Sequence, residues 1–197
     1  MSARVRDRVL VAADAVIREH GAEASMRDIA RTADVGLATL LRHFPSREAL
    51  LAALLRSSFD ALTAGADEAR SGAAPAAALA GWLREFVTFT TEYHGVVTSM
   101  VRAIEEPESA LHDSCVALKA AGARLLADAQ SADAVRADVD GADLFALVSA
   151  LAWLGDQPGQ KARADRLFDL VLTTLLTGSG AAAGGDGADG ETEVADG

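Results

Sequence analysis

Side chains that can bind nucleic acid gather between Ser25 and Leu51, in the segment SMRDIARTADVGLATLLRHFPSREALL. Arginine, histidine and threonine contact the phosphates and base edges of double-stranded DNA. The segment carries such residues at Arg27, Thr39, Arg42, His43 and Arg47. Any one of these arginines taken alone is better explained as an ordinary solvated charge. Their meaning therefore depends on the elements that position them.

The pattern within this segment predicts two short helices, residues 26–33 and 37–44, joined by a tight turn. Ser25 begins a Ser-x-x-acid sequence of the kind that caps a helix. Leu40 and Phe44, four residues apart, would bury the inner side of the second helix. Together the two helices form a helix-turn-helix arrangement, whose second helix fits the DNA major groove.

The chain offers little else that could do chemistry. Cys115 follows His112 by three residues, so the two could share a side of a helix. No third orienting group and no oxyanion site accompany them, which argues against an enzyme. His94, His112 and the pair Glu105 and Glu106 lack the tight spacing of metal ligands. We therefore expect no catalytic site, no metal and no cofactor.

Composition predicts an all-α fold that positions these residues. Half of the 197 residues are hydrophobic, and only 5% are aromatic. Good helix formers are abundant, whereas the residues that favour strands are scarce. Apolar periodicity and the four prolines divide the chain into about nine helices, at about residues 4–20, 26–33, 37–44, 46–69, 75–93, 96–105, 109–129, 142–154 and 160–177.

These helices divide into a DNA-binding head at residues 1–50, a helical body at 51–177 and a disordered acidic tail at 178–197. Residues 1–58 carry nine arginines and seven acidic residues, whereas residues 59–177 carry nine basic and 17 acidic residues. Only the head can approach phosphate without strong repulsion. The tail consists of Gly, Ala and acids with almost no large apolar residue, so it cannot offset its ordering entropy.

The head resembles that of the tetracycline-repressor (TetR) family of bacterial regulators over about residues 5–55. The matching residues are Gly21, Ser25, Ile29-Ala30, Asp34-Val35-Gly36, Thr39-Leu40-Leu41-Arg42-His43-Phe44 and Ser46-Arg47-Glu48-Ala49-Leu50. Four positions depart from the family pattern. Leu41 stands where the family usually has a tyrosine whose hydroxyl contacts a phosphate, and Gly36 replaces a serine cap. Asp34 replaces a glycine of the turn, and Arg47 replaces a lysine.

The resemblance implies a role for each residue of the head. Arg27 and Arg47 would bind phosphates, as would Thr39 and His43, with Thr39 also within reach of a base. The apolar pair at the start of the second helix would lie deepest in the groove and could read thymine methyl groups. Arg42 could reach a base or a phosphate, and the arginines at positions 4, 6 and 8 could form a flanking basic arm. The expected DNA-binding set is Arg27, Gly36, Leu37, Ala38, Thr39, Leu41, Arg42, His43 and Arg47.

Behind the head, the resemblance implies a body that binds a small-molecule effector. Aromatic side chains concentrate there, and an apolar cavity with a few polar tips suits a small molecule. The expected lining is Trp82, Phe86, Phe89, Tyr93, Met100, Arg102, His112 and Trp153. The alternative is that these aromatic side chains, which recur at helical spacing, are simply core.

The last two helices present broad apolar sides that could pair with a second copy as a four-helix bundle. The residues expected at this dimer interface are Leu144, Leu147, Val148, Leu151, Leu167, Leu170, Val171 and Leu175. The alternative is that both helices pack into the core of their own protomer.

Together these features predict a cytoplasmic transcriptional repressor that binds a palindromic operator as a homodimer and is released by a small-molecule effector. The single cysteine fits a reducing compartment. No apolar run approaches the roughly 20 residues of a membrane helix, so we expect no membrane partner. The alternative function is a helical adaptor that binds protein and uses the helix-turn-helix only for packing.

Overall fold

The computed structural model describes residues 2–177, which fold into ten α-helices and one short 3₁₀ helix, with no strand in that range. This confirms the all-α prediction, with one helix more than expected. The acidic tail at 178–197 lies outside the described residues.

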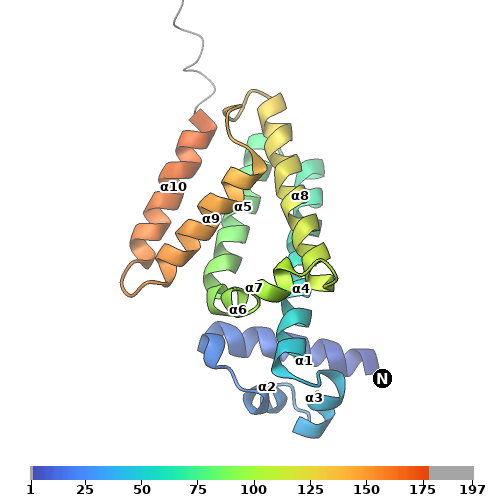
Figure 1. Cartoon of the computed structure of the whole chain (residues 1–197). Helices are drawn as coiled ribbons and strands as arrows, with labels where there is room; N and C mark the ends of the chain where they lie inside the picture. Colours follow the sequence, from blue (N-terminus) through green and yellow to red (C-terminus); the bar gives the residue numbers. More distant parts are fainter. Residues whose placement is uncertain (1, 178–197) are drawn as a thin grey trace, which may run out of the picture.

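The head consists of α1 (Ser2–His20), η1 (Gly21–Glu23), α2 (Met26–Thr32) and α3 (Leu37–His43). The buried stripe of α1 includes Val9, Ala13 and Ile17, which recur every four residues and pack onto the rest of the head. Gly21 ends α1 at a φ of 58°, a conformation that favours glycine. In Figure 1, α1 lies across the foot of the body, and α2 and α3 hang beneath it.

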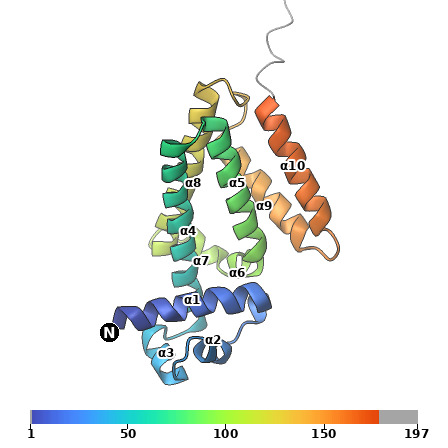
Figure 2. The ribbon, with the colours of Figure 1, turned by 180° about the vertical axis from the view of Figure 1, so that it is seen from behind.

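The body consists of α4 (Arg47–Gly72), α5 (Pro75–Glu92), α6 (His94–Ser99), α7 (Val101–Glu105), α8 (Ala110–Ser131), α9 (Gly141–Asp156) and α10 (Lys161–Thr177). The helices α4, α5, α8 and α9 pack on one another and enclose the core. Both views show α10 on the outside, against α9 (Figures 1 and 2). Helix α4 runs without interruption from the head into the body.

One predicted helix, 96–105, is two helices in the structure. The chain bends at Met100, whose backbone has φ −107° and ψ 7° and whose side chain is buried. The amide of Met100 donates to Val96 O and Val97 O at 3.1 Å. The apolar pattern gave no sign of this bend because every residue across it remains compatible with a helix.

Helix α4 is long and apolar enough to cross a membrane by length and composition alone, contrary to the expectation that no apolar run approaches that length. Its apolar side chains are used inside the protein, since Leu51, Leu55 and Phe59 are buried. Surface ion pairs also join α4 to α8, from Arg70 to Asp128 at 2.5 Å and from Arg124 to Asp67 at 3.1 Å. Its apolar composition is therefore explained by its central place in the fold.

Candidate nucleic-acid interface and body cavity

Helix α3 is anchored by one side and exposed on the other. Leu40 is fully buried and Phe44, the C-terminal cap of α3, is 2% exposed, as their spacing predicts. Ala38, Leu41 and Arg42 are exposed on the outer side. The remaining candidates on this helix, Leu37, Thr39 and His43, are half-buried at its margins. The Arg42 guanidinium donates to Thr39 Oγ1 at 2.9 Å, which holds both polar groups on the same side.

Both neighbouring helices begin with a serine cap and an arginine. Ser25 Oγ accepts from the amide of Asp28 at 3.1 Å, and Ser46 Oγ accepts from the amide of Ala49 at 3.2 Å. Arg27, the second residue of α2, is exposed. Arg47, the first residue of α4, is half-buried, with Nε 3.5 Å from Ala24 O. The two arginines thus lie at helix N-termini, where the backbone also favours negative charge.

The turn between α2 and α3 is held by backbone geometry and by a distant arginine. Asp34 has a φ of 51°, the left-handed conformation that its residue type tolerates. Gly36 is the N-cap of α3 and contributes no side-chain bond. The Arg8 guanidinium donates to Ala33 O at 2.5 Å and to Asp34 O at 3.0 Å. Arg8 therefore fixes the turn that orients α3.

The expected basic arm at the start of the chain is largely engaged within the head. Besides Arg8, Arg6 places its guanidinium 5.3 Å from the centre of the Phe44 ring. Arg4 is exposed. Local sequence patterns do not reveal these roles, because each partner lies at least 25 residues away along the chain.

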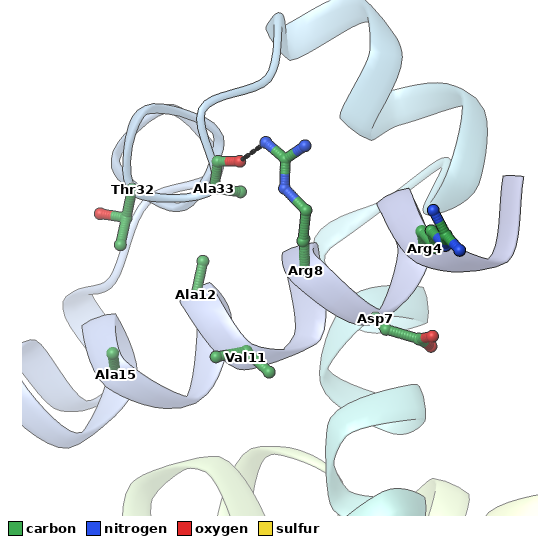
Figure 3. A pocket seen from close by; sticks show the side chains of 8 residues that line it. All are labelled: Arg4, Asp7, Arg8, Val11, Ala12, Ala15, Thr32 and Ala33. Carbon is green, nitrogen blue, oxygen red and sulfur yellow. Dashed lines mark hydrogen bonds between the residues drawn. The ribbon is translucent and has the colours of Figure 1, made fainter. Parts of the chain in front are cut away.

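A shallow groove of about 600 Å³ separates α1 from the end of α2. Figure 3 shows its eight lining residues, with Arg8 reaching across to the Ala33 carbonyl. Its lining includes Ala12, which is buried, and Val11, which is 72% exposed. We call this the head groove.

A larger cavity of about 890 Å³ lies in the body, among α4, α5, α7, α8 and the start of α9. Phenylalanine, leucine, isoleucine and alanine side chains make up most of its wall. We call it the body cavity, and its lining is Phe59, Phe86, Phe89, Thr90, Ile104, Glu105, Cys115, Leu118, Lys119, Ala120, Ala123, Asp140, Gly141, Ala142, Phe145, Ala146 and Ser149.

Of the eight residues expected to line an effector pocket, Phe86 and Phe89 line the body cavity. Trp82 lies behind its wall, stacked on Phe86 with ring centres 5.3 Å apart. The structure places the other five elsewhere. Trp153 is 57% exposed on α9, Arg102 is exposed on α7, and Met100 and Tyr93 are buried outside the cavity. His112 is half-buried, with Nδ1 2.8 Å from Ile104 O.

Tyr93, the C-terminal cap of α5, joins the body to the head. Its ring is 1% exposed and stacks on Phe89 with centres 5.0 Å apart. Its hydroxyl donates to Asp14 Oδ1 on α1, and Arg18 of α1 lies over the ring and pairs with Glu92. Burial, and then the hydrogen bond and charge of Asp14, raise the pKa of the Tyr93 phenol, so it remains a donor at neutral pH. We call this the Tyr93 junction.

The residues expected at a dimer interface divide into two groups. Leu144, Val148, Leu151 and Leu175 are buried in the core of their own protomer, so they cannot also meet a second copy. Leu170 is 62% exposed and Leu167 37% exposed, while Leu147 and Val171 are half-buried. Trp153, expected in the pocket, is instead the third large apolar side chain exposed on α9 and α10.

The structure provides no support for cysteine chemistry at Cys115. Burial raises the pKa of the Cys115 thiol, with a smaller opposite effect from Lys119, so the thiol is neutral at pH 7. Within residues 2–177, no group of three or more His, Cys, Asp or Glu side chains is arranged to hold a metal ion.

Known protein families match both parts of the chain. Residues 9–54 match the family described as bacterial regulatory proteins, tetR family, and residues 74–177 match the SbtR-like C-terminal domain of transcriptional regulators. No curated protein matches the sequence.

Solved structures match the whole fold. A TetR transcriptional regulator from Streptomyces coelicolor is 34% identical over 87% of this chain and 98% of its own, with a TM-score of 0.71. A TetR regulatory protein from Mycobacterium vanbaalenii is 30% identical over 89% of this chain and 96% of its own, with a TM-score of 0.68. The regulator FadR from Bacillus subtilis, in complex with stearoyl-CoA, is 18% identical over 87% of this chain and 97% of its own, with a TM-score of 0.60, and shares the fold. Over both of its parts, the chain belongs to the TetR family of transcriptional regulators.

Proposed function

We propose that this protein is a cytoplasmic transcriptional repressor that binds a palindromic operator as a homodimer and releases it when a small molecule fills the body cavity. The observation that carries the proposal is the exposed outer side of α3, flanked by two helix N-termini that each present an arginine. The helix would enter the major groove, while Arg27 and Arg47 would bind the phosphates beside it.

In the groove, Leu37 and Ala38 at the start of α3 would contact base edges, where apolar side chains read thymine methyl groups. Thr39, Arg42 and His43 would contact the backbone or a neighbouring base, with Leu41 beside them. Gly36 would allow the strand to approach the N-terminus of α3 closely, since it carries no side chain.

We expect a homodimer because one head alone would bind DNA only weakly. A single helix-turn-helix binds weakly, whereas two linked heads can occupy two half-sites on successive turns of DNA. The exposed Trp153, Leu167 and Leu170 support α9 and α10 as the contact surface.

Release by an effector is supported by the position of the body cavity above the Tyr93 junction. Phe89 lines the cavity and stacks on Tyr93, which in turn bonds Asp14 of the head. A ligand that moves Phe89 would therefore shift α1, and with it the head. The bound stearoyl-CoA of the related FadR structure supports a ligand-binding role for this fold.

The test begins with selection of bound fragments from random duplexes, followed by gel-shift titration over a range of salt. We expect one palindrome to be selected and its affinity to fall steeply with salt. Arg47→Ala should weaken binding to all duplexes by a similar factor and reduce the salt slope by about one. Arg56→Ala, an exposed arginine further along α4, is the matched control and should leave both quantities unchanged. A protein that stays monomeric and ignores every duplex at low ionic strength would exclude the proposal and favour a protein-binding adaptor.

A further inference from the structure

The interior of the body cavity presents no charged partner to a ligand. The ionisable side chains along its wall, apart from the neutral Cys115 thiol, are Glu105, Lys119 and Asp140, and all three residues are exposed. They therefore lie towards the mouth, where one positive and two negative charges leave a net charge of −1. A ligand that carried a charge into the interior would lose its hydration without compensation.

Of the other polar groups of the cavity wall, Thr90 and Asp140 are already engaged, the Cys115 thiol is neutral, and Ser149 is exposed. Thr90 Oγ1 donates to carbonyl oxygens of its own helix, Phe86 O and Val87 O, both at 3.0 Å. Asp140 Oδ1 accepts from the amide of Asp143 at 2.9 Å as the cap of α9. Burial raises the pKa of the Cys115 thiol, which keeps it uncharged. Recognition inside the cavity must therefore come mainly from apolar and aromatic contact.

Four phenylalanine rings provide that contact from three helices. Phe86 of α5 and Phe145 of α9 meet edge to face, with centres 4.9 Å apart and planes at 61°. Phe59 of α4 and Phe89 of α5 meet at 5.7 Å and 73°. Rings in this arrangement offer both edges and faces. A flat aromatic ligand can stack on the faces and meet the edges, and these contacts add to its burial, whereas a flexible alkyl chain makes no such ring contacts.

We infer that the body cavity binds an uncharged, planar aromatic molecule whose rings lie among these four phenylalanines. Only the description of this ligand as an effector rests on the proposed function. The binding of the ligand itself is measured without DNA. Any polar group of the ligand would be directed towards Glu105 and Lys119 at the mouth, in contact with water. A volume of about 890 Å³ accommodates a molecule of two or more fused rings.

Isothermal titration calorimetry of the full chain with four probes at pH 7 tests this ligand class. The probes are 2-naphthol, which is neutral and flat, the anion 2-naphthoate, the cation of 1-naphthylmethylamine, and 1-octanol, which is neutral but flexible. We expect 2-naphthol to bind with a Kd at least tenfold lower than each of the other three. Equal or tighter binding of any other probe, or no binding of 2-naphthol, would overturn the inference.

Replacing one of two alanines on α8 by phenylalanine locates the binding site. Ala120 lines the cavity, whereas Ala117 is exposed on the same helix outside it. Ala120→Phe should narrow the cavity and weaken 2-naphthol binding at least tenfold, and Ala117→Phe should leave it unchanged. Equal effects from the two variants would place the ligand elsewhere. Tight 2-naphthol binding by a protein that binds no DNA would refute the proposed function and leave this inference intact.

Discussion

At the residue scale, the outer side of α3 carries one apolar side chain in an unusual place. Leu41 is 40% exposed, at the position where the family usually has a tyrosine that contacts a phosphate. A leucine there can neither donate nor accept a hydrogen bond. The proposed interface would therefore lack one backbone contact in each half-site.

Leu41→Tyr should restore that contact. We expect the variant to bind all duplexes about fivefold more tightly per half-site, because one added hydrogen bond contributes roughly 1 kcal/mol. The measurement is a gel-shift titration with the selected operator and with random duplex. Leu41→Phe, which adds the ring without the hydroxyl, is the control. Equal affinity for the Tyr and Phe variants would exclude a phosphate contact at this position.

Whether the sequence predicts a residue's role depends on how far away its partner lies along the chain. The cap Ser25 was predicted, since its partner, the amide of Asp28, lies only three residues along the chain. Arg8, which bonds carbonyl oxygens 25 and 26 residues away, was expected to belong to a flanking basic arm. Only the packing of α1 against α2 reveals that it holds the turn.

At the element scale, the cavity wall depends on a close approach between α5 and α8. A Cβ atom at Gly122 would lie 2.6 Å from Trp82 Cη2 and 2.9 Å from Trp82 Cζ3. The Trp82 ring cannot easily retreat, because it is buried and its Nε1 donates to Leu62 O at 2.9 Å. Phe145, a cavity-lining ring, would also lie only 3.2 Å from the added atom.

Gly122→Ala should therefore lower the free energy of unfolding, by about 1–2 kcal/mol net of the gain in helix propensity. Urea unfolding followed by circular dichroism measures the change. Gly81→Ala, in the middle of α5 with no atom within 4 Å of the added Cβ, is the matched control. It should raise stability by about 0.5–1 kcal/mol. A stabilising effect at both positions would contradict the close contact with Trp82.

The Tyr93 junction is the element-scale link between cavity and head. Tyr93→Phe keeps the ring on Phe89 and removes only the bond to Asp14. We expect stability to fall by roughly 1 kcal/mol, operator affinity without ligand to change little, and the ligand concentration that gives half release to rise several-fold.

Thr91→Val is the control for the Tyr93 variant. It also removes a hydroxyl from α5, but Thr91 Oγ1 bonds Val87 O of its own helix at 2.8 Å and nothing in the head. Gel shifts over a ligand titration, for both variants, measure release. If Tyr93→Phe is released at the same ligand concentration as the unaltered protein, the junction carries no signal.

At the scale of the whole molecule, α9 and α10 carry three of the six large apolar side chains that the described residues expose. They are Trp153 of α9 and Leu167 and Leu170 of α10, and both helices lie at the same side of the body (Figures 1 and 2). Burying them against a twin would remove apolar area from water and place two heads on one molecule.

Leu170→Glu should therefore weaken the proposed dimer at least tenfold, since a carboxylate would be buried without a partner. Sedimentation velocity over a range of protein concentration measures the monomer–dimer equilibrium. Val116→Glu, on α8 at 51% exposure, introduces the same charge at another exposed apolar position and should leave the equilibrium unchanged. A Leu170→Glu protein that remains dimeric would place the interface elsewhere.

The sequence predicted the helices well and the cavity poorly. Helix positions follow from local periodicity and caps, and all nine expected segments are present, one of them divided at Met100. The cavity, in contrast, is lined by residues from five helices. Trp153 and Phe145 both belong to the apolar run of α9, and only the packing of that helix turns Phe145 inward and leaves Trp153 exposed.

The unbroken helix α4 has a mechanical consequence. Its 26 residues span about 39 Å at 1.5 Å per residue, with the cavity-lining Phe59 near the middle and Arg47 at the head end. A tilt of only about 5° about its far end displaces Arg47 by roughly 3 Å, close to the spacing of successive base pairs. Such a lever would convert a movement of under about 2 Å at Phe59 into one of nearly a full base-pair step at the head.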